Sequence, residues 1–249
     1  MKFFIPLLIS IIAGLSTVIG SLLIFLKPKN INNYIGASLA FSASIMMLLS
    51  IAELIPEGFI YLEYRYNLLT ASIILVLTIV VGNFLSKTIN KKIDHYKKID
   101  SSLYRVGVLS MIALMLHNLP EGILTFLSSM IDIKLGIKLS VAIMLHNIPE
   151  GIAIAIPIYY ATKNKFKAVK STLISGLSEP LGAIIAWIFF RNYLSNLIIS
   201  IILLFVAGLM ISISINDIFE EANKYSRKSI IVGVVLAILI FIMNFIFFK

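Results

Sequence analysis

Long apolar runs separated by short charged breaks are the main pattern of this sequence. The first run, Phe3–Leu26, contains no charged residue, and comparable runs recur to the end of the chain. A helix needs about 20 apolar residues to cross the hydrocarbon core of a bilayer. The runs are continuous and do not alternate, which disfavours membrane-spanning strands. Because the first run is longer than the core of a signal peptide and no cleavage site follows it, we expect a retained helix.

The apolar runs predict eight membrane-spanning helices. The second, fourth and fifth are long enough to require tilt or protrusion from the bilayer. We therefore expect an all-α, polytopic membrane protein with a single transmembrane domain over residues 1–249 and a short basic cytoplasmic loop over residues 87–102. The predicted spans are Phe4–Leu26, Tyr34–Ile60, Leu68–Ser86, Leu103–Met130, Leu135–Ala161, Ala168–Phe190, Leu194–Asn216 and Ser229–Phe248.

Composition agrees with a membrane location and removes several alternatives. Hydrophobic residues make up 59% of the chain and charged residues 13%, about half the charged share of a soluble domain. Cysteine is absent, which excludes disulfides and thiolate metal ligands. The net charge of +9 would suit a nucleic-acid partner. In a membrane protein, however, such an excess usually comes from basic loops on the cytoplasmic side.

The distribution of the basic residues predicts an orientation. Most of the 21 Lys and Arg lie in or beside the loops after the first, third, fifth and seventh spans. Positive residues stay on the cytoplasmic side, so we expect both termini outside the cell (inner or plasma) membrane. The basic excess then reflects topology, and no nucleic-acid partner is needed. The opposite face holds only Lys2, Arg65, Lys134, Lys138, Arg191 and Lys249.

Two histidines open the same hexapeptide within apolar runs. The sequence HNLPEG begins at His117 in the fourth span, and HNIPEG begins at His146 in the fifth. Each copy places a glutamate, Glu121 or Glu150, near the middle of a predicted span. A carboxylate at that depth costs about 3 kcal/mol even on mild insertion scales. A chain that accepts this cost twice, with the same neighbouring residues, is most simply explained by the binding of a cation.

Helix geometry places the glutamate of each motif between its imidazole and its amide. At about 100° per residue, Glu121 lies at an angle between His117 and Asn118. Glu121 can therefore share one cation with His117 and a second cation with Asn118. The corresponding residues of the second motif are Glu150, His146 and Asn147.

Prolines and further acids extend this pattern. Pro120 and Pro149 each free a backbone carbonyl one turn earlier and favour a kink, which suits a translocation site better than a rigid structural site. Glu179, followed by Pro180, is a third carboxylate within a span and has no basic residue nearby in sequence. Acids at the ends of the second and seventh spans could attract a cation on its way in or out. They are Glu53, Glu57, Asp217, Glu220 and Glu221.

The paired HNxPEG motifs and the Glu-Pro of the sixth span resemble the ZIP (Zrt/Irt-like) metal transporters, especially their broad-specificity bacterial branch. The resemblance implies an uptake carrier in which spans 1–3 and 6–8 form inverted repeats around spans 4 and 5. It also implies a central binuclear metal site. The first metal position would use His117, Glu121, His146 and Glu150, completed by Met46 or, next, Met47. The second would use Asn118, Asn147 and Glu179 with the same two glutamates.

The expected function is therefore uptake of a divalent transition metal, most simply Zn²⁺ but also Fe²⁺, Mn²⁺ or Co²⁺, as substrate rather than cofactor. The alternative is an intramembrane dimetal enzyme, although no HExxH motif is present. A buried His or Glu can also simply hydrogen-bond a neighbouring helix, and a Met such as Met46 can fill a packing gap. Many relatives carry a histidine-rich loop, whereas only His95 lies in this one. A homodimer is left open.

Overall fold

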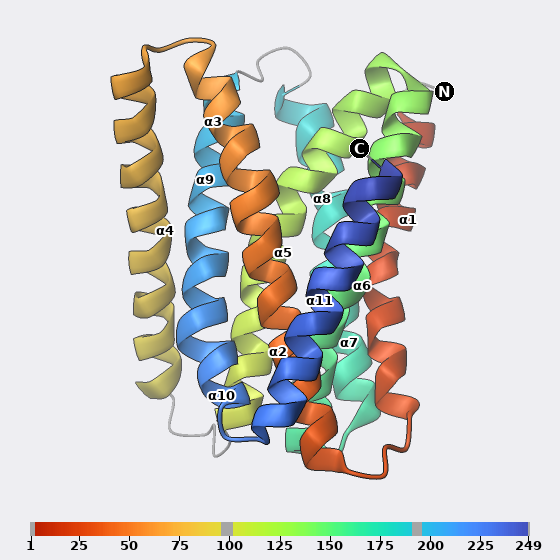
Figure 1. The fold of residues 1–249 in the computed structure, drawn as a ribbon. Coiled ribbons are helices and arrows are strands. Elements are labelled where there is room, and N and C mark those ends of the chain that lie inside the picture. The colour runs from red at the N-terminus through yellow and green to blue at the C-terminus, as the bar shows by residue number, and fades with distance from the viewer. Residues whose placement is uncertain (1–2, 96–101, 191–195, 249) are drawn as a thin grey trace.

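The structure is a computed structural model that describes residues 3–95, 102–190 and 196–248. All regular structure in these residues is helical, and the eight predicted helices are present (Figure 1). Several of them are built from consecutive segments. The elements are α1 (Phe4–Ser21) with a 3-10 turn η1 (Leu22–Phe25), α2 (Ile31–Leu49), the π turn η2 (Ser50–Leu54), α3 (Ile55–Glu63), α4 (Leu68–His95), α5 (Ser102–Ile131), α6 (Ile133–Thr162), α7 (Lys165–Gly176), α8 (Ser178–Ile185), the π turn η3 (Ala186–Phe190), α9 (Asn196–Ile213), the π turn η4 (Ser214–Phe219), α10 (Glu220–Ala222) and α11 (Arg227–Phe248).

Polar caps begin several of these helices. The side chains of Asn30, Asp132 and Asn164 accept hydrogen bonds from backbone N–H groups in the first turns of α2, α6 and α7, which satisfies donors that a helix start leaves open. α6 ends at Thr162, and the φ of 57° at the next residue, Lys163, lies in the left-handed region and turns the chain toward α7. α4 continues to His95, beyond the end of its apolar run, because lysine-rich sequence sustains a helix well in water.

The exposed surface is that of a membrane protein. Among the described residues, seven helices are long and apolar enough to cross a bilayer, and α11 packs along α2 as the eighth helix. Large apolar side chains point outward from α1, α4 and α11, for example Leu8, Val80 and Leu239, each more than half exposed. Lipid tails are the surroundings in which such exposure costs nothing. The prediction of an all-α, polytopic membrane protein is therefore confirmed.

The helices pack as two groups of four. We call α1, α5, α6 and the α7–α8 helix the motif group, because its members include both HNxPEG motifs. The most extensive contacts within it join α1 to α6, α5 to α6, and α5 to α8. The remaining helices form the outer group, in which α2 packs on α11 and α4 packs on α9. Contacts of α2 with α6 and of α5 with α9 join the two groups.

The packing partners fit inverted repeats around α5 and α6. In such repeats the equivalent helices would be α1 and α7–α8, α2–α3 and α9–α10, α4 and α11, and α5 and α6. When each helix is replaced by its equivalent, a pair of helices in close contact becomes another pair in close contact. The contact of α1 with α6 becomes that of α8 with α5, and the contact of α2 with α11 becomes that of α9 with α4. The helices α2–α3 and α9–α10 each also contain a π turn, at Ser50–Leu54 and at Ser214–Phe219.

The connections divide the bundle into two ends (Figure 1). The start of α1 and the end of α11 lie toward the same end of the bundle. The loops 26–30, 163–164 and 223–226 lie at the other end, which we call the basic end because of its lysines. Eight helices that alternate in direction bring the chain back to the end at which it started, so the start of α1 and the end of α11 lie on the same side.

Candidate metal centre

The two HNxPEG motifs lie in the middle of α5 and α6, which pack closely against each other in the motif group. Both helices continue through their motif prolines, Pro120 and Pro149. The side chains that carry charge are turned inward. His117 is 2% exposed, Glu121 6% and Glu150 1%. Ionisable groups from both motifs therefore occupy the interior of the bundle, where water does not stabilise them.

One imidazole stands between the carboxylates of both motifs. The Nε2 atom of His117 lies 2.9 Å from Oε1 of Glu121, one turn later on α5, and 3.5 Å from Oε1 of Glu150 on α6. Imidazole nitrogen and carboxylate oxygen are the ligands by which proteins without cysteine bind zinc. The helix pairing thus brings together three candidate ligands that lie on two different elements.

Asn118 links the first motif to the glutamate of the second. In one orientation its amide nitrogen lies 3.4 Å from the backbone oxygen of Ser175. With the amide turned over, the nitrogen donates to Leu114 O at 3.0 Å and to Oε2 of Glu150 at 3.2 Å. The second orientation makes two good hydrogen bonds and is the one we adopt. Glu150 then faces α5 with both oxygens, one toward His117 and one toward Asn118.

The asparagine of the second motif meets a carboxylate from α8. The amide nitrogen of Asn147 donates to Oε1 of Glu179 at 2.5 Å and to the backbone oxygen of Ala13 on α1 at 3.0 Å. Both side chains are fully buried. The carbonyl oxygen of Asn147 accepts no hydrogen bond within the described part of the chain. An amide oxygen and a carboxylate are therefore available here as neutral and anionic oxygen ligands.

Two predicted ligands are placed only in part. His146 lies within α6, but its side chain is outside the described residues. Met46 is fully buried on α2, one turn after Ser42, whose hydroxyl donates to the backbone oxygen of Pro149 at 3.5 Å. α2 therefore packs against the second motif. Among the described His, Asp and Glu side chains, no group of three is placed so that it could hold a metal ion.

The charge balance of this region also favours a cation. Glu121, Glu150 and Glu179 are buried at 6%, 1% and 0% exposure. The helices that carry them have no Lys or Arg between residues 105 and 134, 138 and 163, or 170 and 191. Buried carboxylates are stable only when paired, protonated or coordinated to a metal. A divalent ion would supply the positive charge that these helix segments lack.

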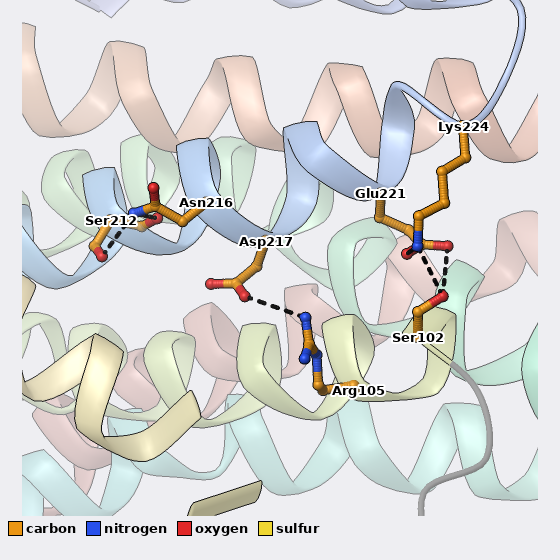
Figure 2. A network of polar contacts seen from close by, with 7 residues as sticks. All are labelled: Ser102, Arg105, Ser212, Asn216, Asp217, Glu221 and Lys224. Carbon is orange, nitrogen blue, oxygen red and sulfur yellow. Dashed lines mark hydrogen bonds and ion pairs between the residues drawn. The ribbon is translucent and has the colours of Figure 1, made fainter. Parts of the chain in front are cut away.

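The acids near the basic end of α9–α10 have protein partners instead (Figure 2). Asp217, in η4, lies 4.0 Å from Nη2 of Arg105 on α5. Glu221 accepts a hydrogen bond from the Ser102 hydroxyl at 3.1 Å and pairs with Lys224 at 2.7 Å. These contacts tie the start of α5 to the outer group. The other acids at span ends, Glu53, Glu57 and Glu220, are half-buried or exposed.

Sequence reasoning assigned no part of the site to α1, yet α1 borders it. The backbone oxygen of Ala13 accepts a hydrogen bond from Asn147. The signal that could have shown this is a short internal repeat. Gly14-Leu15-Ser16 on α1 recurs as Gly176-Leu177-Ser178 directly before Glu179. The repeat marks α1 as the counterpart of the helix that carries the third carboxylate.

Comparison with known proteins gives one consistent family. Residues 82–246 match the family described as ZIP Zinc transporter. The chain is 36% identical to the zinc transporter ZupT of Streptococcus mutans over 98% of both chains. It is 34% identical to the zinc transporter ZupT of Clostridium perfringens over 88% of this chain and 87% of that protein. It is 36% identical to the zinc transporter ZupT of Oceanobacillus iheyensis over 88% of each.

Proposed function

The chain belongs to the ZIP zinc transporter family, and from that premise we propose that it carries zinc into the cytoplasm through the buried centre on α5, α6 and α8. It is a multi-pass membrane transporter and not an enzyme. The ion is the cargo, so the centre must bind it and also release it.

One observation supports this proposal above the others. The carboxylates of two separate motifs converge on the same imidazole, with Nε2 of His117 at 2.9 Å from Glu121 and at 3.5 Å from Glu150. A purely structural hydrogen bond would need only one of the two. Two buried carboxylates at one imidazole repel each other unless one is protonated or a cation lies between them, and a divalent ion would satisfy both at once.

We assign two metal positions to this centre. The first takes His117, Glu121, His146 and Glu150 as ligands, with Met46 as a fifth from α2. The second takes Asn118, Asn147 and Glu179, together with the same two glutamates as bridges. Histidine, carboxylate and amide ligands without thiolate bind several divalent metals. We therefore expect Fe²⁺, Mn²⁺ and Co²⁺ to compete with zinc.

The orientation proposed for uptake places the basic end in the cytoplasm and both termini outside, following the excess of positive residues. The centre lies between the two ends of α5 and α6, near the bilayer midplane. In this orientation zinc reaches the centre from the end where the chain termini lie. It leaves past the basic end.

The direct test is zinc movement into liposomes that hold a trapped zinc-sensitive dye. Three purified proteins are compared, namely the wild type, Glu150→Gln and Glu63→Gln, in which an exposed acid at the end of α3 is changed instead. We expect the wild type and Glu63→Gln to fill the vesicles at similar rates. Glu150→Gln should reduce the rate at least tenfold, since a bridging ligand is lost. Equal rates in all three proteins would falsify the proposed centre.

A further inference from the structure

The internal repeat places Thr17 where α8 has Glu179. The sequence Gly14-Leu15-Ser16-Thr17 of α1 aligns with Gly176-Leu177-Ser178-Glu179. The two segments cross at their glycines. A Cβ atom on Gly14 would overlap the backbone oxygen of Gly176, and one on Gly176 would overlap that of Gly14. The crossing is therefore symmetrical to the level of single atoms.

The two segments also contact the two motifs in the same way. A Cβ on Gly151, the last residue of the second motif, would overlap the backbone oxygen of Thr17. A Cβ on Gly122, the last residue of the first motif, would overlap that of Glu179. Thr17 therefore packs on the second motif as Glu179 packs on the first.

The motif asparagines follow the same symmetry. The amide of Asn147 lies 3.0 Å from the backbone oxygen of Ala13, four residues before Thr17. The amide group of Asn118 lies 3.4 Å from the backbone oxygen of Ser175, four residues before Glu179, and in the orientation adopted above this approach is a packing contact and not a hydrogen bond. Each asparagine thus contacts the repeat segment that packs on its own motif. Glu179, which packs on the first motif, accepts a hydrogen bond from Asn147 of the second motif. By the same symmetry, a glutamate in place of Thr17, which packs on the second motif, would be directed toward Asn118 of the first.

The two repeat segments differ in charge at the position of Thr17, because its equivalent is Glu179. Thr17 is fully buried, and its hydroxyl has no hydrogen-bond partner in the part of the chain that the structure describes. A Cβ on Gly176 would come within 3.3 Å of that hydroxyl, which places the Thr17 side chain on the side of the α7–α8 helix. An uncharged, short side chain therefore occupies the place that a fourth carboxylate would fill.

We propose that Thr17 sets how firmly the centre holds its cargo, by limiting it to three carboxylates. With neutral histidines, three carboxylates leave one net positive charge when two divalent ions are bound. A fourth would neutralise both ions completely and slow their release, because attraction between charges is strong where water is excluded. Thr17 is thus a residue that favours release. This inference rests on the proposed function, since it concerns the same centre.

The test measures how long zinc stays bound. Purified protein is loaded with zinc and then mixed with excess chelator, and the fraction of zinc retained is followed with time, together with the number of ions bound per chain. We expect Thr17→Glu to retain zinc roughly tenfold longer or more than the wild type. Thr17→Gln, equal in size but neutral, should release zinc as the wild type does or faster. The pair Thr17→Asp and Thr17→Asn repeats the comparison with side chains close to threonine in volume, in case glutamate prevents folding.

The symmetry gives a second arm. The double variant Thr17→Glu with Glu179→Thr again has three carboxylates at the centre, but the third one stands at position 17 instead of position 179. It should bind more zinc than Glu179→Thr alone and release it faster than Thr17→Glu alone. The proposal would be overturned if Thr17→Glu retained zinc no longer than Thr17→Gln and Thr17→Asp no longer than Thr17→Asn. It would also be overturned if the double variant bound no more zinc than Glu179→Thr. If Glu150→Gln binds zinc as the wild type does, the centre itself is wrong, whatever Thr17 does.

Discussion

At the scale of residues, Glu150 of the second motif faces the first motif with both of its oxygens. Its Oε1 lies 3.5 Å from His117 and its Oε2 lies 3.2 Å from the amide of Asn118. The carboxylate is thus held by the opposite motif at both oxygens. Such bracing fixes the distance between α5 and α6 at the level of the centre, which any bound ion would also require.

His117 should determine affinity more than it determines folding. Replacing it with alanine removes one nitrogen ligand and leaves two carboxylates facing each other, so we expect the apparent affinity for zinc to fall at least tenfold. The measurement is the zinc concentration that gives half-maximal liposome filling. His95→Ala serves as the control, since that histidine lies among lysines outside the motifs. An unchanged half-maximal concentration for His117→Ala would remove this imidazole from the ligand set.

Outside the centre, a buried ion pair should contribute more to the stability of the fold than an exposed one. The Asp217 side chain is 2% exposed and pairs with Arg105, whereas the Lys224 side chain is 53% exposed. We expect Asp217→Asn to lower the unfolding temperature in detergent by several degrees, because it leaves a partly buried guanidinium without its counter-charge. Lys224→Ala should cost less than about 1 kcal/mol. Thermal unfolding of both variants decides the point, and the reverse order would contradict it.

At the scale of elements, glycines set how closely the helices approach. Gly176→Ala should destabilise the protein, although alanine normally favours a helix over glycine by about 1 kcal/mol. The reason is that the added methyl would overlap the backbone of Gly14, and neither backbone can give way. The yield of monodisperse protein and its unfolding temperature are the readouts. Val80→Ala, on the exposed face of α4, should change neither.

The elements that sequence predicted well are those fixed by local properties. The helices follow from the length of each apolar run, which depends only on neighbouring residues, and α5 and α6 were placed correctly for the same reason. The π turns at Ser50–Leu54 and Ser214–Phe219 depend on packing against other helices. The role of α1 was missed because Asn147 contacts a backbone oxygen, that of Ala13, which no side-chain motif reveals.

At the scale of the whole molecule, the orientation can be read from single cysteines, because the native chain contains none. The connection between α3 and α4 and the start of α7 lie at opposite ends of the bundle (Figure 1). They contain the exposed residues Arg65 and Lys165, respectively. We expect Arg65→Cys to react with a membrane-impermeant maleimide in intact cells. Lys165→Cys should react only after the membrane is permeabilised. Labelling in the opposite pattern would place the termini inside and reverse the proposed direction of transport.

The division into two groups also has a consequence for the order in which the protein can be built. Every helix of the motif group has been synthesised once residue 190 is made, whereas α2 and α4 must still wait for α11 and α9, which pack against them. The centre can therefore assemble while the outer group remains unpaired in the bilayer. The last helix synthesised, α11, completes the surroundings of the centre rather than the centre itself.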